Sequence, residues 1–140
     1  MSDILDLYEY AQSQGIAVEC FNLPENISLS IMDNDGNCYI AIDPSRTQNQ
    51  ADELCRLAHE VGHCVKGSFY NRYSQLDIKQ KHENRADKWA ISYLIPNERL
   101  KQAVSMGLTE PYELSEHFGV PQDFMIKAIN YYQTQAVGAK

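Results

Sequence analysis

One short stretch of the chain holds residues that could bind a metal ion and use it. It reads His59-Glu60-Val61-Gly62-His63, the pattern His-Glu-x-x-His. On an α-helix the two histidines lie on one face, roughly 6 Å apart along the axis, so both imidazoles can bind one zinc ion at about 2.0–2.1 Å. Glu60 then lies beside the metal, where a general base can take a proton from zinc-bound water.

A second segment supplies carboxylates for the same site. Glu83 and Asp87 lie one helical turn apart within residues 82–96, whose apolar positions recur at helical spacing. A catalytic zinc usually has three protein ligands and one open position, and Glu83 with the two histidines completes that set. Asp87 could accept a hydrogen bond from the second ring nitrogen of one histidine and fix its tautomer. The alternative is a solvated helix face with Glu83 and Asp87 paired to nearby cations, but the two motifs together favour the metal site.

The paired motifs resemble those of the ImmA/IrrE family of small bacterial and phage metallopeptidases, which belong to the gluzincin class. The resemblance covers roughly residues 40–130. Mild departures from the family pattern at 61, 89 and 93–95 remove neither a ligand nor the base. The residues that carry the resemblance are His59-Glu60-Val61-Gly62-His63, Glu83-x-x-Ala86-Asp87-x-Trp89-Ala90 and Leu94-Ile95-Pro96.

This resemblance implies an activity and a division of roles. It implies that His59, His63 and Glu83 bind Zn²⁺ and that Glu60 is the catalytic base. It also implies a zinc metalloendopeptidase that cleaves a protein substrate, often a helix-turn-helix transcriptional repressor of a phage or mobile element. The alternative is a zinc-binding antirepressor or toxin–antitoxin partner that acts by contact, without proteolysis.

Peptide hydrolysis also requires a hydrogen-bond donor for the developing oxyanion. Tyr70, Tyr73 and His82 lie between the two motifs or at the start of the second. Each of them could supply this hydrogen bond, although for each residue taken alone a surface or packing role is favoured. The sequence does not choose among them.

Composition limits the other classes of function. The chain has 140 residues and a net charge of −7, which argues against nucleic-acid binding through bulk charge. Residues 114–121 resemble the turn of a helix-turn-helix, but the following helix has Lys127 as its one basic residue. We therefore interpret residues 110–133 as a packing or partner-binding element, with a DNA-associated regulator as the less favoured alternative.

The chain lacks a run of about 18 apolar residues, so we expect no membrane span. Its acidic start lacks the features of a signal peptide. We therefore predict a cytoplasmic protein, in which Cys20, Cys38, Cys55 and Cys64 are free thiols.

The spacing of apolar residues and the capping residues predict the helices and strands that position these side chains. We predict one domain over residues 1–134, a frayed tail over 135–140, and a loop or short helix over 68–81. The fold class is α+β: a small antiparallel sheet packed on the His-Glu-x-x-His helix, with a helical C-terminal half. Helices are predicted at 2–14, 50–65, 82–96, 97–106, 109–118 and 121–133, and strands at 16–21, 28–32 and 38–42.

Two expectations concern close approaches to the metal helix. Strand 38–42, which pairs with 28–32 through a turn at 33–36, is our candidate for an edge strand that could pair with an extended peptide substrate.

Gly62 lies within the predicted metal helix. Because glycine has no side chain, we expect another segment to approach the helix closely at this position.

Overall fold

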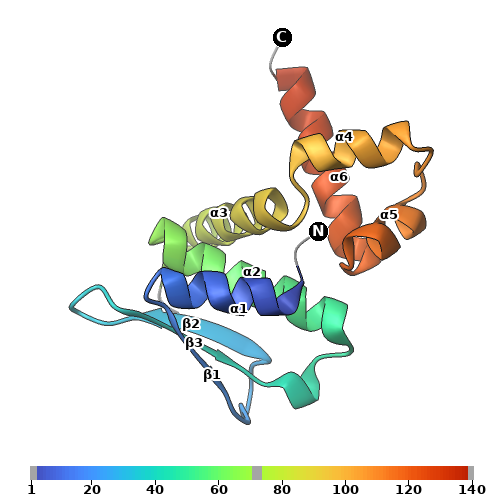
Figure 1. The fold of residues 1–140 in the computed structure, drawn as a ribbon. Coiled ribbons are helices and arrows are strands. Elements are labelled where there is room, and N and C mark those ends of the chain that lie inside the picture. Colours follow the sequence, from blue (N-terminus) through green and yellow to red (C-terminus); the bar gives the residue numbers. More distant parts are fainter. Residues whose placement is uncertain (1–2, 71–73, 139–140) are drawn as a thin grey trace.

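Six α-helices and a three-stranded sheet make up the part of the chain that the computed structural model describes, residues 3–70 and 74–138. The predicted α+β class is confirmed. The sheet lies at one end of the molecule beneath α1 and α2, and α4, α5 and α6 gather at the other (Figure 1). The elements are α1 (Ile4–Ser13), β1 (Ala17–Cys20), β2 (Ser28–Met32), β3 (Cys38–Ile42), the 3-10 helix η1 (Pro44–Arg46), α2 (Gln50–Lys66), α3 (Leu76–Leu94), α4 (Asn97–Ser105), α5 (Pro111–Phe118) and α6 (Gln122–Gly138).

Helix α2 is the centre of the packing. The Asn49 side chain caps its start by accepting from the backbone N–H of Asp52, and Gly67 ends it in the left-handed conformation. Its apolar residues Leu57, Ala58 and Val61 are fully buried. They pack with residues from α1, the sheet and α3 in one continuous core. This burial fixes the rotation of α2 and therefore the direction in which its polar residues point.

The sheet has the strand order β1-β3-β2. Strands β2 and β3 form the predicted antiparallel hairpin, with Ser30 opposite Ile40. Strand β1 pairs with β3 in parallel, with Val18 also opposite Ile40. The prediction of an antiparallel sheet is therefore corrected for β1. The reason is topological: residues 21–27 carry the chain past the position of β3, so β2 is added at the far edge and β3 returns between the two.

The same strand order corrects the predicted edge strand. Strand 38–42 is β3, which is paired on both sides and has no free edge. Its burial agrees, because four of its five residues are buried. Strand β2, which is more exposed, is the edge that lies next to α2. Any peptide that extends the sheet on this side must therefore pair with β2.

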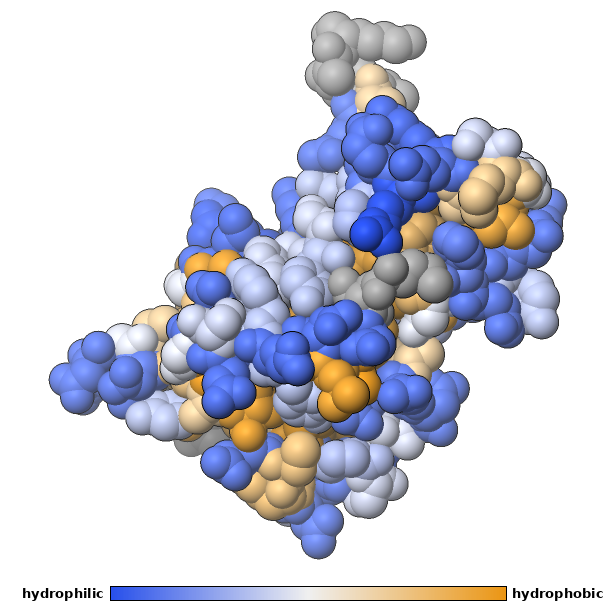
Figure 2. Space-filling model, viewed as in Figure 1, coloured by the Kyte–Doolittle hydropathy of each residue, from blue (hydrophilic) through white to orange (hydrophobic). Residues whose placement is uncertain are grey.

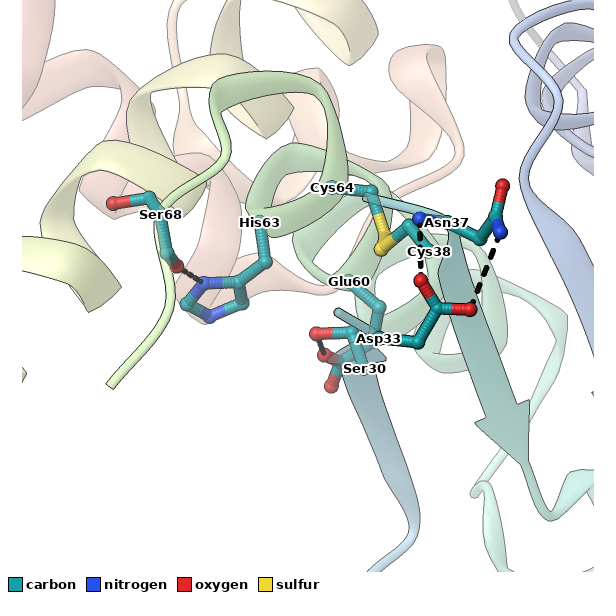
Figure 3. The surroundings of a disulfide bond; sticks show 8 residues. All are labelled: Ser30, Asp33, Asn37, Cys38, Glu60, His63, Cys64 and Ser68. Carbon is teal, nitrogen blue, oxygen red and sulfur yellow. Dashed lines mark hydrogen bonds between the residues drawn. A yellow bond between two sulfur atoms is a disulfide. The ribbon is translucent and has the colours of Figure 1, made fainter. Parts of the chain in front are cut away.

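A disulfide links the sheet to α2 (Figure 3). It joins Cys38, at the start of β3, to Cys64, in the last turn of α2, and their Cα atoms are 5.8 Å apart. The prediction of four free thiols is therefore wrong for this pair, while Cys20 and Cys55 are free. The prediction rested on the expected compartment, whereas the bond depends on a tertiary contact between residues 26 positions apart.

Helices α2 and α3 approach each other closely at Gly62. A β-carbon at this position would lie 2.6 Å from the carbonyl oxygen of Ala86, closer than packed atoms come. The expectation that Gly62 allows a close approach is confirmed, and the segment that approaches is α3. This contact brings the two predicted metal-binding segments side by side.

Two helices are longer than predicted. Helix α3 begins at Leu76, within the stretch predicted as a loop or short helix, and α6 continues to Gly138, past the predicted end at 133 and into the predicted tail. Among the described helices, none combines the length and the apolar character needed to cross a membrane. The face in Figure 2 is mostly hydrophilic, with scattered apolar patches of the kind common on protein surfaces.

Candidate metal centre

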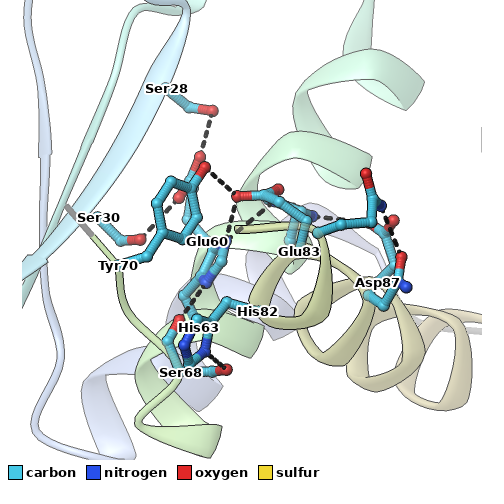
Figure 4. Close-up of polar contacts among 12 residues, drawn as sticks. Ser28, Ser30, Glu60, His63, Ser68, Tyr70, His82, Glu83 and Asp87 are labelled. Atoms are coloured by element: carbon cyan, nitrogen blue, oxygen red, sulfur yellow. Dashed lines mark hydrogen bonds and ion pairs between the residues drawn. The ribbon is translucent and has the colours of Figure 1, made fainter. Parts of the chain in front are cut away.

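Helices α2 and α3 bring the three predicted metal ligands together. In α2, the Nε2 atoms of His59 and His63 are 3.2 Å apart. From α3, the Glu83 carboxylate oxygens lie 2.7 Å from Nε2 of His59 and 3.2 Å from Nε2 of His63. The donor atoms of this group all lie within 4.8 Å of one another. Figure 4 shows His63 and Glu83 pointing toward each other from their two helices.

The group has the chemistry of a metal site. Two imidazole nitrogens and one carboxylate form a three-ligand set that leaves a fourth position open. Ligands bound at about 2.0–2.1 Å in a tetrahedron are separated by roughly 3.3 Å, and the spacing of the two histidine nitrogens is 3.2 Å. His59, His63 and Glu83 can therefore hold one metal ion with little rearrangement.

The second ring nitrogen of each histidine has a hydrogen-bond acceptor. Nδ1 of His59 lies 2.8 Å from the Asp87 carboxylate, and Nδ1 of His63 lies 2.6 Å from the backbone carbonyl oxygen of Ser68. Because both partners can only accept, both Nδ1 atoms donate their protons. Each Nε2 is then the atom that a metal ion would take. The structure places Asp87 where it was predicted, whereas sequence reasoning missed Ser68.

Asp87 is itself held by the C-terminal half of the molecule. Its second carboxylate oxygen lies 3.1 Å from Nζ of Lys127, which is on α6. A chain of contacts therefore runs from α6 through Asp87 to the ring of His59. The sequence gives no signal for this ion pair, because its partners are 40 residues apart.

Glu60 lies beside the ligands and is held by the edge strand. Its side chain is buried, at 7% exposed. Ser28 and Ser30 of β2 each donate a hydroxyl hydrogen bond of 2.8 Å, one to each Glu60 carboxylate oxygen, as Figure 4 shows. Sequence reasoning missed both serines. The signal was present, because alternate residues of a strand share a face and 28–30 reads Ser-Leu-Ser.

The described candidates for an oxyanion donor, Tyr70 and His82, have different hydrogen-bond partners. The Tyr70 hydroxyl donates a 2.7 Å hydrogen bond to Glu83 and therefore reaches the donor group. His82 instead bonds through Nδ1 to the Ser68 hydroxyl, on the side of His63 away from Glu83 in Figure 4. Tyr73 lies outside the described residues. Of the two described candidates, Tyr70 and His82, Tyr70 is therefore the one that contacts the donor group.

The centre is electrostatically coupled. Burial lowers the pKa of His59, but hydrogen bonds to Asp87 and Glu83 outweigh it and raise that pKa to about 10. Hydrogen bonds from His59 and His63 lower the pKa of Glu83. The Tyr70 hydroxyl bonds to Glu83, and this hydrogen bond together with burial raises the pKa of Tyr70 to about 12. Without metal, the proton on Nε2 of His59 binds Glu83, and a metal ion would replace that proton.

A cleft of about 1040 Å³ gives access to the centre. It extends from β2 and the residues before it, across the three metal donors, to the start of α6. Its lining includes Ser28 on one wall, Cys55 and Phe124 on the other, and Tyr70 above the donors. A volume of this size lies at the upper limit of the range for small-ligand sites, about 300–1,000 Å³, and is compatible with a segment of polypeptide.

The fold and the donor group define a metallopeptidase-type domain. Residues 11–130 match the family model described as the IrrE N-terminal-like domain, peptidase family M78, and the chain belongs to this family. The predicted family is therefore confirmed, and the match begins earlier than the region of resemblance at 40–130. A comparison with curated proteins finds no match to this chain.

Proposed function

We propose that this protein is a zinc-dependent endopeptidase in which His59, His63 and Glu83 hold the metal and Glu60 is the general base. The observation that carries the proposal is the convergence of two histidine nitrogens and the Glu83 carboxylate within 4.8 Å. Membership of a peptidase family supports the same reading. The burial of Glu60 beside this group, rather than within it, supports a role other than ligand.

The proposed mechanism assigns a task to each residue. His59, His63 and Glu83 would hold a zinc ion, which would supply Lewis-acid activation of water and of the scissile carbonyl. Glu60 takes the proton of the attacking water and passes it to the leaving amine. Asp87 and the Ser68 carbonyl hold the histidine tautomers. Tyr70, whose hydroxyl donates to Glu83 in this structure, would turn that hydrogen bond to the oxyanion.

We further propose that the substrate is a protein that binds in extended form along β2. This strand is the sheet edge beside Glu60 and contributes Ser28 and Ser30 to the cleft. Strand addition would supply backbone hydrogen bonds without demanding a particular sequence. The resemblance noted above supports a helix-turn-helix repressor of a phage or mobile element as the substrate. No nucleic acid or membrane takes part in the proposed reaction.

The test compares wild type with Glu60→Gln, Glu83→Ala and the matched control Glu98→Gln, an exposed glutamate on α4. Each protein is supplied with zinc, assayed for bound metal, and incubated with a peptide library prepared from bacterial proteins. Mass spectrometry then identifies new cleavage products. We expect Glu60→Gln to bind about one zinc ion but to cleave roughly 10²- to 10⁴-fold more slowly. We expect Glu83→Ala to lose most of its zinc and Glu98→Gln to behave as wild type.

Two results would contradict the proposal. If wild type binds no zinc after reconstitution, the donor group is not a metal site. If Glu60→Gln cleaves at the wild-type rate, Glu60 is not the base. Binding of zinc without cleavage by any of the proteins would favour the contact-only alternative, an antirepressor or toxin–antitoxin partner.

A further inference from the structure

A second hollow lies on the outer side of α3 and combines cations with aromatic rings. Its volume is about 430 Å³. Four of its six lining residues lie on α3 at positions 85, 88, 89 and 92, the spacing of one helix face. The end of α2 and the middle of α6 contribute one residue each. The lining residues are Lys66, Arg85, Lys88, Trp89, Ser92 and Tyr131.

This groove is separate from the catalytic cleft. No residue lines both of them. On α3, Glu83 and Asp87 point to the metal donors, and positions 85–92 of the groove lie on roughly the opposite side of the helix at 3.6 residues per turn. The groove therefore needs an explanation other than peptide hydrolysis.

The charge of the groove is opposite to that of the molecule. The chain carries a net charge of −7, yet the lining has three cations and no carboxylate. In the described part of the chain, none of these cations forms an ion pair, whereas Arg56 and Lys127 in the catalytic cleft pair with Asp52 and Asp87. Clustered like charges repel one another, so an anion bound among them would be stabilised.

The two tyrosines that contact the groove's tryptophan do not lie on opposite faces of its ring. The Trp89 centroid lies 5.1 Å from that of Tyr93 and 5.7 Å from that of Tyr10. The two tyrosine centroids are 5.4 Å from each other, so they cannot lie on opposite faces of the indole, where their separation would approach the sum of two stacking distances. One face of Trp89 therefore carries neither tyrosine. Trp89 lines the groove and is only partly buried, so we infer that a flat ring in the groove would stack on this face.

We propose that this groove binds a nucleoside phosphate. The phosphate would contact Lys66, Arg85 and Lys88, and the base would stack on Trp89. The planar guanidinium of Arg85 suits a bidentate contact to phosphate oxygens. The volume falls within the range of small-ligand sites, about 300–1,000 Å³. The ligand could be a free nucleotide or one unit of a single strand, because both present a phosphate and a base.

The chain provides its own reporter for this binding. Trp89 is the only tryptophan in the sequence, so intrinsic indole fluorescence reports on the groove alone. The full chain is titrated with ADP, inorganic pyrophosphate, adenosine and a single-stranded oligothymidylate, with excitation at the long-wavelength edge of the indole band, where nucleotides absorb little. We expect saturable quenching by ADP, weaker binding of pyrophosphate and adenosine, and at least roughly tenfold weaker ADP binding by Arg85→Ala/Lys88→Ala.

The control is Lys101→Ala, which removes an exposed cation of α4 outside the groove and should bind ADP as wild type does. Tighter binding of ADP than of oligothymidylate, per nucleotide, identifies a free nucleotide as the ligand. The reverse order, with a steep salt dependence, identifies a single strand. The proposal is overturned if ADP causes no saturable quenching, if pyrophosphate or adenosine binds as tightly as ADP, or if the double variant matches the control. Circular dichroism verifies that each variant is folded.

Discussion

At the scale of single residues, the centre depends on partners that hold side chains in one orientation. Glu60 has a hydroxyl on each carboxylate oxygen, and each histidine has an acceptor on Nδ1. If Glu60 is the base and the histidines are ligands, as proposed, such contacts hold them in position before a substrate arrives and lower the cost of reaching the reactive geometry. Residues outside the ligand set should therefore affect the rate without affecting metal content.

Ser28→Ala and Ser30→Ala test this expectation. Each removes one hydrogen bond to Glu60, and we expect each to lower kcat by roughly tenfold while the protein still binds about one zinc ion. Ser30→Thr keeps a hydroxyl and should recover much of the rate. The peptide assay and metal analysis above provide both readouts. Loss of zinc in parallel with loss of rate would instead indicate a general disruption of the centre.

The raised pKa of His59 predicts how the stability of the metal-free protein depends on pH. His59 binds its proton more tightly in the folded state, with a pKa of about 10, than in the unfolded state, with a pKa of about 6.5. Its contribution is therefore complete below about pH 6.5 and is lost as the pH rises toward 10. Glu83 has the opposite sign, because its lowered pKa stabilises the fold above its ordinary value and ceases to do so in acid.

Thermal unfolding of chelator-treated protein between pH 6 and pH 10.5 measures this effect. We expect the Tm of wild type to fall across this range more steeply than that of His59→Gln, which lacks the titrating ring. The variant keeps every other group that titrates in the same range, so the difference between the two curves measures His59 together with its coupling to His63 and Glu83. Parallel curves would show that its contacts with Asp87 and Glu83 do not stabilise the fold.

At the scale of elements, the distance between α2 and α3 decides whether the donors meet. The three donor residues lie on two helices that touch at Gly62 and Ala86. Because these are backbone contacts, no side-chain rotation can absorb a larger residue at 62. The spacing of the donors therefore depends on the absence of a side chain at this position.

Gly62→Ala should separate the helices. A β-carbon 2.6 Å from the Ala86 oxygen must displace backbone, and we expect a loss of about 1–3 kcal/mol in unfolding free energy with weaker zinc binding. Denaturant unfolding and zinc titration measure the two effects. Helix propensity alone predicts the opposite sign, a gain of up to about 1 kcal/mol, so a stabilised variant would refute the close-contact argument.

Features that carry a sequence motif could be predicted from the sequence, whereas other contacts between elements could not. The convergence of His59, His63 and Glu83 was predictable because the two histidines are one turn apart and Glu83 lies in a second recognisable motif. The hairpin was predictable from its turn and its alternation. The parallel pairing of β1 and the bond between Cys38 and Cys64 were not, because both depend on contacts between elements. Ser28 and Ser30 are an intermediate case. The sequence predicts that they share one face of a strand, but not that this face contacts Glu60.

At the scale of the whole molecule, the catalytic cleft and the groove use the two sides of α3. Glu83 and Asp87 face the metal donors, while Arg85, Lys88 and Trp89 face the groove. The net charge of the chain does not reveal the cationic groove, because carboxylates elsewhere in the chain outweigh its three cations. A ligand on one side of α3 therefore lies one helix diameter from the metal donors on the other, roughly 10 Å.

The ion pair between Lys127 and Asp87 has a consequence during protein synthesis. Lys127 follows Asp87 by 40 residues, so a nascent chain that has just completed α3 already contains all three metal donors but not the cation that holds Asp87. The contact behind His59 forms only after α6 has emerged from the ribosome and docked. A growing chain can therefore bring His59, His63 and Glu83 together early, whereas the contacts around them reach their final arrangement late in translation.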